Sequence, residues 1–129
     1  MFANSQVNTM SATPHPTDIK YSRKDAILSV TFNNDEQFEL SAEFLRVYSP
    51  SAEVRGHGRG QEVLQTGKEN VAIDAIEPVG NYAVRLRFDD GHSTGLYSFT
   101  ELYRLGSHRD ELWQAYLQQL AQAGVQRNV

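Results

Sequence analysis

Cysteine is the most informative absence from this sequence of 129 residues. Without cysteine the chain has no disulfide, no thiolate metal ligand and no cysteine nucleophile. Disulfides are typical of oxidising compartments, so their absence fits a reducing one, and we expect a cytoplasmic protein.

Positive charge and long apolar runs are also scarce. Twelve lysines and arginines stand against sixteen acidic residues, which gives a net charge of −4. Domains that bind nucleic acid usually carry a basic face, so we expect no nucleic-acid partner. No apolar run approaches the ~18 residues that a membrane-spanning helix needs, and the first residues lack the apolar core of a secretory signal. We therefore expect neither a membrane partner nor a leader peptide.

The length of the chain predicts one domain with a core of its own. Residues 1–16 are rich in Ser, Thr, Asn and Pro and poor in large apolar side chains, which predicts a disordered tail. We expect the folded domain to span residues 17–106. A C-terminal helix over 107–124 is expected to pack on or beside it.

A β-hairpin from Gly80 to Tyr97 is the feature around which we expect the fold to be organised. Its apolar positions alternate with polar or small residues, as in a strand with one buried face: Tyr82, Val84, Leu86 and Phe88. Asp90 and Gly91 suit a tight turn, because both residue types tolerate positive φ. The hairpin predicts a sheet with one face on the core.

The remaining pattern predicts an α+β fold, with a mainly antiparallel β-sheet, short helices and a C-terminal amphipathic helix. Strands are expected at 17–22, 26–32, 37–40 and 71–79, and helices at 42–48, 98–105 and 107–124. Ser41 is the expected N-cap of the first helix, and Ser98 with Glu101 forms a capping box for the second, which Gly106 ends. The last helix, opened by Ser107, has an apolar stripe that predicts a packing face: Leu112, Trp113, Tyr116, Leu117 and Leu120.

Candidate chemistry is sparse. If the hairpin turn has two residues, Asp89 and His92 lie opposite each other on the face that carries Arg85 and Arg87, and this polar cluster could hold an anion or a metal-bound group. The alternative is a solvated sheet face with one cross-strand ion pair worth ~0.2–1 kcal/mol. The glycine-rich loop over 51–70 is the segment most suited to carry a site. It lacks the lysine–serine pair of a P-loop, and no catalytic triad can be assembled from adjacent turn residues.

Two stretches together resemble the gamma-butyrobetaine hydroxylase-like N-terminal domain family. They are Leu-Arg-Val-Tyr-Ser-Pro-Ser-Ala-Glu-Val at 45–54 and the segment over 79–98, which contains Asp-Gly-His-Ser-Thr-Gly-Leu-Tyr. The resemblance covers about residues 17–105. It implies a small, mostly β accessory module, which in other proteins precedes an oxygenase domain or is fused to an iron–sulphur carrier ATPase.

The resemblance also implies a metal position that this chain has altered. Zinc-binding members use a Cys-Pro-Cys-x-x-Cys run and the histidine of Asp-Gly-His. Those positions hold Ser49, Ser51, Val54 and His92 here, and only the histidine is a good zinc ligand. We therefore expect no cofactor, the zinc of related proteins being lost.

The resulting hypothesis is a non-catalytic accessory module that binds an unknown protein partner, linked by family analogy to iron–sulphur or oxygenase biology. We do not expect an enzyme, because no convergent titratable groups are evident. The candidate binding residues are Arg46, His57, Arg85, Arg87 and Asp89. The alternative is a metal-binding domain in which His92 acts with His57 and Glu53 of the loop. Oligomeric state stays open, because the stripe around Trp113 could cover its own sheet or a neighbour's.

Overall fold

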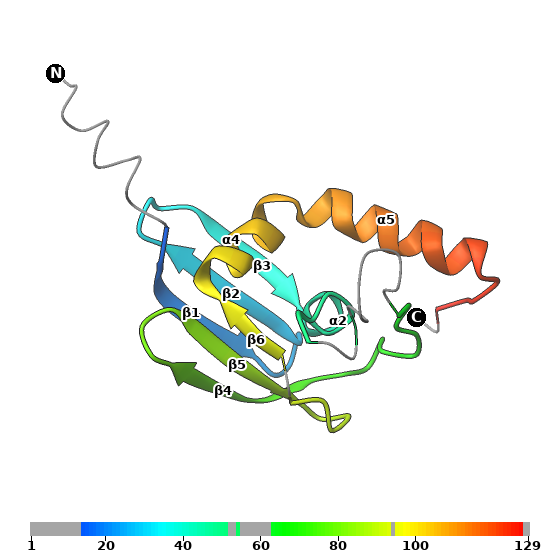
Figure 1. Ribbon diagram of the computed structural model, residues 1–129, viewed down its shortest axis with the longest axis horizontal. Helices are drawn as coiled ribbons and strands as arrows, with labels where there is room; N and C mark the ends of the chain where they lie inside the picture. Colours follow the sequence, from blue (N-terminus) through cyan, green and yellow to red (C-terminus); the bar gives the residue numbers. More distant parts are fainter. Residues whose placement is uncertain (1–13, 52–53, 55–62, 94, 128–129) are drawn as a thin grey trace, which may run out of the picture.

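The computed structural model describes residues 14–51, 54, 63–93 and 95–127. Its elements in chain order are β1 (Pro16–Ser22), β2 (Ile27–Phe32), β3 (Gln37–Ser41), α2 (Ala42–Val47), β4 (Ile73–Val79), β5 (Ala83–Phe88), β6 (Gly95–Ser98), α4 (Phe99–Ser107) and α5 (Arg109–Gln122). The order confirms the predicted α+β class with its C-terminal helices (Figure 1). Among the described residues, no helix has the length and apolarity to cross a membrane.

The first three strands form an antiparallel meander in the order β1-β2-β3. Alternate residues of β2 are buried, as the period of two predicts: Leu28, Val30 and Phe32. The sheet starts earlier than expected. β1 begins at Pro16, so Pro16 belongs to the sheet and not to the predicted tail, and the carbonyl of His15 accepts a hydrogen bond from the amide of Asn33.

The last three strands form a second antiparallel sheet in the order β4-β5-β6, which contains the predicted hairpin. Val84, Leu86 and Phe88 point into the core as expected. Tyr82 does not, because β5 starts one residue later and Tyr82 lies in the preceding turn with 55% of its surface exposed. The two-residue turn on which the predicted polar cluster depended is not present: the amide of Phe88 donates to the carbonyl of His92 at 2.9 Å, and β6 begins at Gly95, which pairs with Leu86.

The helices begin largely as their capping residues predict. The Ser41 side chain accepts a hydrogen bond of 3.0 Å from the amide of Phe44, and the Ser98 side chain accepts one of 3.0 Å from Glu101. Gly106 does not end α4 but lies inside it. The N-cap of α5 is His108 rather than Ser107, and its side chain makes no capping hydrogen bond.

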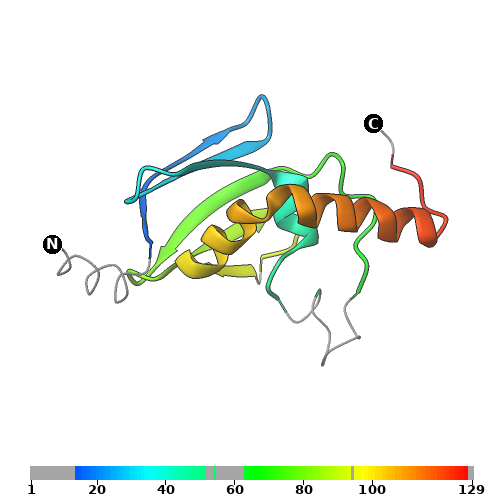
Figure 2. The ribbon, with the colours of Figure 1, turned by 90° about the horizontal axis from the view of Figure 1, so that it is seen from above.

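Helix α4 bridges the two sheets, because it contacts β3 of the first and β6 of the second. Figure 2 shows α4 and α5 following one another along the same side of the strands, with α5 extending beyond them. The main core lies between these layers and includes the largest buried side chains: Phe32, Phe44, Leu45, Ile73, Leu86, Tyr97, Leu102 and Leu105. A smaller cluster of Val47, Tyr116 and Leu120 joins the C-terminal half of α5 to the end of α2.

Tyrosine hydroxyls connect elements that lie far apart in the sequence. Tyr97 donates to the carbonyl of Leu45 in α2, and Tyr48 donates to the carbonyl of Leu112 in α5 at 2.6 Å. Burial raises the pKa of Tyr97, so this hydroxyl remains a donor at neutral pH. These bonds satisfy polar groups inside the core, and none of the buried side-chain nitrogen or oxygen atoms in the described part lacks a partner.

Candidate functional site

His92 lies in a buried polar cluster with the two serines that follow α2. Its Nε2 atom is 2.9 Å from Oγ of Ser49 and 3.3 Å from Oγ of Ser51. The three residues expose 6%, 1% and 6% of their surfaces, respectively. The amide of Ser51 donates to Oγ of Ser49 at 3.3 Å, which fixes the turn between them. The structure thus brings together three of the four positions singled out by the family resemblance.

The fourth position, Val54, is placed next to the cluster by its backbone. Its amide donates to the carbonyl of Ser51 at 3.1 Å, and its side chain is buried. Val54 and Ser49 line the same pocket. Glu53 and His57, the other predicted loop residues, lie outside the described residues.

Zinc does not fit the donors that this cluster offers. A structural zinc site takes four sulphur, imidazole or carboxylate ligands, whereas His92 is accompanied here by two neutral hydroxyls and an aliphatic side chain. Among the described residues, no group of three or more His, Cys, Asp or Glu side chains is placed to hold a metal ion. The donor chemistry therefore argues against the metal that the resemblance implies.

Asp90 forms the centre of a second cluster, directly before the His92 turn. Its Oδ2 atom accepts hydrogen bonds from Nε of Arg46 at 2.9 Å and from Nζ of Lys68 at 2.8 Å, and its Oδ1 accepts one from the His92 amide at 3.1 Å. Burial alone would raise the pKa of Asp90, but the hydrogen bonds from Lys68, the His92 amide and Arg46 outweigh burial and lower it to about 2. Asp90 is therefore a permanent anion that holds three segments together.

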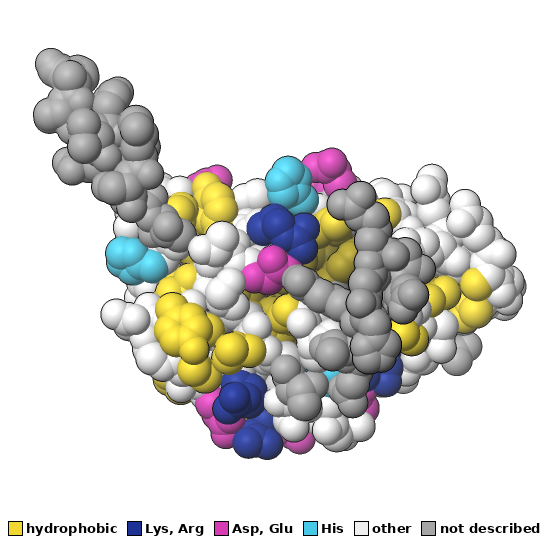
Figure 3. Space-filling model, viewed as in Figure 1, with side chains coloured by type: hydrophobic (Ala, Val, Ile, Leu, Met, Phe, Trp, Pro, Cys, Tyr) yellow, Lys and Arg dark blue, Asp and Glu magenta, His cyan; other side chains and the backbone are white. Residues whose placement is uncertain are grey.

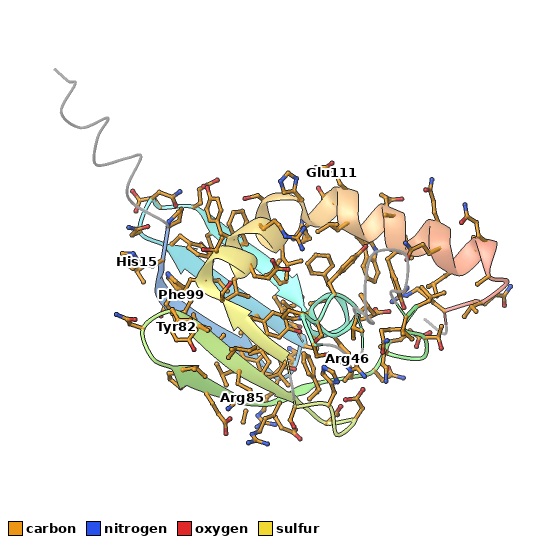
Figure 4. All side chains as sticks on the ribbon, viewed as in Figure 1. His15, Arg46, Tyr82, Arg85, Phe99 and Glu111 are labelled. Atoms are coloured by element: carbon orange, nitrogen blue, oxygen red, sulfur yellow. The ribbon has the colours of Figure 1, made fainter. Side chains whose placement is uncertain are left out.

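Arg46 is not the exposed binding residue that the sequence suggested. Its side chain is only 9% exposed, and Nη1 donates to Oε1 of Gln65 at 3.1 Å in addition to the bond with Asp90. Figure 4 shows Arg46 at the α2 end of the sheet, well away from Arg85. The guanidinium is a structural link between α2, the loop before β4 and the turn before β6.

The predicted polar cluster of Asp89, His92, Arg85 and Arg87 does not form. Arg87 and Arg85 lie on the outer face of the sheet, where both reach the carboxylate of Glu77, at 2.9 Å and 3.8 Å. Asp89 instead pairs with Ala72 through two hydrogen bonds of 2.9 Å and 3.0 Å. The reason is the longer connection between β5 and β6, which turns His92 into the core. The exposed ion pairs of Glu77 fit the solvated sheet face that was the alternative.

An open pocket of about 1100 Å³ lies beside this cluster, between the end of α2, residues 63–65, α4 and α5. We call it the α5 groove. Its apolar floor includes Val47, Val54 and Tyr116, and its rim carries Gln119, Gln122, Glu101 and Arg104. Figure 3 shows hydrophobic side chains between charged ones in the region of these helices.

The groove was not predicted, although its apolar floor follows from the α5 stripe. Four segments supply its walls, and only the stripe on α5 is visible as a pattern in the sequence. The run of uncharged residues over 114–126 was a further signal, because a surface helix normally carries charges on its solvent side.

A second, smaller hollow of about 540 Å³ lies at the opposite end of the sheets. It is lined by Pro14, His15, Asn81, Tyr82, Phe99 and Thr100. Tyr82 and Phe99 lie side by side in Figure 4, and a hydrophobic patch occupies the same position in Figure 3.

The fold and these two surfaces define a small α+β domain with an open groove beside α5 and no cluster of metal ligands in its described part. Residues 19–103 match the family described as gamma-butyrobetaine hydroxylase-like, N-terminal, and the chain belongs to this family. The family description refers to an N-terminal domain.

Several solved structures resemble the chain. Two proteins with NMR solution structures are 56% and 45% identical, with TM-scores of 0.78 and 0.79; each alignment covers 91% of this chain, and 87% and 92% of the respective relative. The crystal structure of a DUF971-family protein of unknown function from Acidithiobacillus ferrooxidans ATCC 23270 is 33% identical, with a TM-score of 0.61, and its alignment covers 71% of this chain and 92% of that one. No curated protein matches.

Proposed function

We propose that the protein is a non-catalytic binding module that holds an uncharged, partly apolar segment of a partner protein in the α5 groove. The observation that carries this proposal is the combination of an apolar floor with an electrically neutral rim. Pockets of this size with a few convergent polar groups are typical binding sites. The family description supports an accessory role, since it refers to the N-terminal part of an enzyme.

The charges at the groove neutralise each other. Arg104 donates to both carboxylate oxygens of Glu101, at 3.1 Å and 2.8 Å. The opposite wall offers the side-chain amides of Gln119 and Gln122, which can pair with main-chain N–H and C=O groups. The described lining residues offer a strongly charged ligand no unpaired opposite charge, which favours a neutral peptide segment.

Neither of the two tyrosines that line the groove, Tyr48 and Tyr116, is suited to acid–base catalysis. Burial is the main cause that raises the pKa of Tyr48, and burial together with the charge of Glu43 raises the pKa of Tyr116 to about 12. Both phenols stay protonated at neutral pH, whereas an effective general base has a pKa near the working pH. The tyrosines can donate hydrogen bonds or pack, which is what a binding surface requires.

Two neighbouring glutamines of α5 allow a matched test. Gln119 lines the groove, whereas Gln118 is exposed on the same helix outside the groove lining. Peptides selected from a displayed library on the wild-type protein should bind Gln119→Arg at least about tenfold more weakly, a loss of about 1.4 kcal/mol. Their affinity for Gln118→Arg should be unchanged.

The outcome separates the groove from other surfaces. If the peptides bind Gln119→Arg as tightly as they bind the wild type, the ligand lies elsewhere. If Gln118→Arg lowers their affinity as much as Gln119→Arg does, the groove is also rejected as the binding site. A Tyr82→Ala variant reports on the hollow at the other end of the sheets, because Tyr82 lines that hollow and not the α5 groove. If Tyr82→Ala loses peptide binding and Gln119→Arg keeps it, the peptides bind in the hollow next to Tyr82 and not in the α5 groove.

A further inference from the structure

The cluster of Ser49, Ser51 and His92 joins two segments that are more than 40 positions apart. The separations in sequence are 43 residues for Ser49 and 41 residues for Ser51. One segment follows α2, and the other is the turn that leads into β6. A buried cross-link at this point is what a structural metal ion would provide.

The geometry of the cluster is close to that of a metal site. Tetrahedral zinc with bonds of about 2.0–2.3 Å separates its ligands by roughly 3.5 Å. The two hydroxyl oxygens lie 2.9 Å and 3.3 Å from Nε2 of His92, a few tenths of an ångström closer. Both distances are ordinary hydrogen-bond lengths, so the three side chains form a cage that direct hydrogen bonds close without a metal.

Serine hydroxyls suit this hydrogen-bonded cluster because each hydroxyl can both donate and accept a hydrogen bond. Oγ of Ser49 accepts from the Ser51 amide and lies within hydrogen-bonding distance of His92. A tight approach of the β6 strand encloses the cluster. A Cβ on Gly95 would come within 2.7 Å of Oγ of Ser49, so only glycine leaves room at this position.

We propose that this hydroxyl–imidazole cluster takes the place of a metal ion, and that the cage remains a latent zinc site. The cluster holds the loop after α2 to the β6 turn without metal. Replacement of Ser49, Ser51 and Val54 by cysteine should supply three thiolates beside the His92 imidazole, because both serine side chains contact the ring and the amide of Val54 is bonded to the carbonyl of Ser51.

The first arm of the test uses the wild-type protein, free of any tag. We expect fewer than about 0.1 zinc ions per purified chain, and a melting temperature that changes by less than about 1 °C when zinc or a chelator is added. One zinc per chain, or a melting temperature that falls with chelator, would overturn the proposal.

The second arm uses the triple variant S49C/S51C/V54C, purified in reductant. It should bind one zinc at least about 100-fold more tightly than the wild type, and cobalt should give the visible spectrum of a tetrahedral thiolate site. Adding His92→Asn to the triple variant should weaken zinc binding at least about tenfold. If the triple variant binds zinc no more tightly than the wild type, the proposal is contradicted. The same holds if the triple variant is unfolded and added zinc does not restore its fold.

Discussion

Nε of Arg46 donates a 2.9 Å hydrogen bond to Oδ2 of Asp90, across 44 positions of the sequence. The Arg46 side chain is 9% exposed and that of Asp90 is 23% exposed, so the pair is largely shielded from water. The same carboxylate orients the turn through the His92 amide. The ion pair therefore helps to fix the turn that carries His92, because Asp90 binds both Arg46 and the His92 amide.

Removing both partners of the pair should cost less than the sum of the two single losses. In Arg46→Met the Asp90 carboxylate loses one of its hydrogen-bond donors while it remains largely shielded from water. We expect the free energy of unfolding to fall by about 2–4 kcal/mol. Asp90→Asn should cost about 1–3 kcal/mol. The double variant should be more stable than the sum of the two losses predicts, by about 1–3 kcal/mol, in urea unfolding.

Lys68 provides the control for this cycle. It reaches the same oxygen at 2.8 Å but contributes through a side chain that is 22% exposed. Lys68→Met should therefore cost less than Arg46→Met. Strictly additive losses for Arg46 and Asp90 would show that the two residues act independently.

The low pKa of Asp90 predicts acid sensitivity. The folded-state pKa is about 2, below the reference value of 3.8, so the unfolded chain takes up the proton first as the pH falls. Asp90 then contributes stability that is fully present well above pH 3.8 and is lost as the pH falls through 2. The loss from this group should reach about 1 kcal/mol at pH 3 and about 2 kcal/mol at pH 2.

The comparison that isolates Asp90 is the pH profile of Asp90→Asn. Between pH 6 and pH 3, the stability of the variant should fall by about 1 kcal/mol less than that of the wild type. Parallel profiles would contradict the assigned pKa. Unfolding by urea at each pH provides the measurement.

Local patterns predicted the elements well, and contacts between elements account for what the sequence could not predict. Ser41 and Ser98 cap helices as expected, because capping depends on residues three positions apart. Tyr82 was assigned to a buried face because the alternation continues through it, but the strand starts one residue later. The burial of His92 depends on the length of the turn, and residue types alone did not reveal that length.

At the candidate site, too, the sequence pointed to individual residues but not to the contacts between them. The family resemblance singled out Ser49, Ser51 and His92, but only the fold shows that their side chains meet. Arg46 was predicted as a binding residue, but its side chain is only 9% exposed. Its partner Asp90 is 44 positions away, and no local pattern connects them. The α5 groove is likewise a product of packing between four segments.

Gly106 provides a test in which the usual rule for helices should be reversed. Replacing a glycine inside a helix by alanine normally stabilises it by about 0.5–1 kcal/mol. Here an added Cβ would lie 2.4 Å from ring atoms of Phe38. We therefore expect Gly106→Ala to lower the free energy of unfolding by about 1–3 kcal/mol.

The cause of this loss can be checked in a Phe38→Ala background. Without the ring, the loss caused by Gly106→Ala should become much smaller, because the 2.4 Å contacts with ring atoms are gone and only the Cβ of residue 38, 3.0 Å away, still opposes the gain in helix propensity. A loss of equal size in both backgrounds would show that the ring is not responsible. Thermal unfolding followed by circular dichroism is sufficient for the comparison.

The C-terminal segment is held by Arg127, which pairs with Glu43 of α2. Nε donates to Oε2 at 3.0 Å, and Nη2 donates to Oε1, so the contact is bidentate. The guanidinium also lies 5.2 Å from the centre of the Trp113 ring. Arg127→Ala leaves the Glu43 carboxylate, which is 9% exposed, without this donor, and we expect a loss of about 1–3 kcal/mol.

Arg127→Lys distinguishes charge from geometry at this contact. Lysine keeps the positive charge but lacks the planar fork that binds both carboxylate oxygens, so its stability should lie between those of the wild type and Arg127→Ala. Trp113 is the one tryptophan in the chain, and its fluorescence reports directly on the segment above it. Emission should shift to longer wavelength in Arg127→Ala, because the ring loses its cover. An unchanged spectrum and unchanged stability in both variants would mean that Arg127 does not hold the C-terminal segment against α2 in solution.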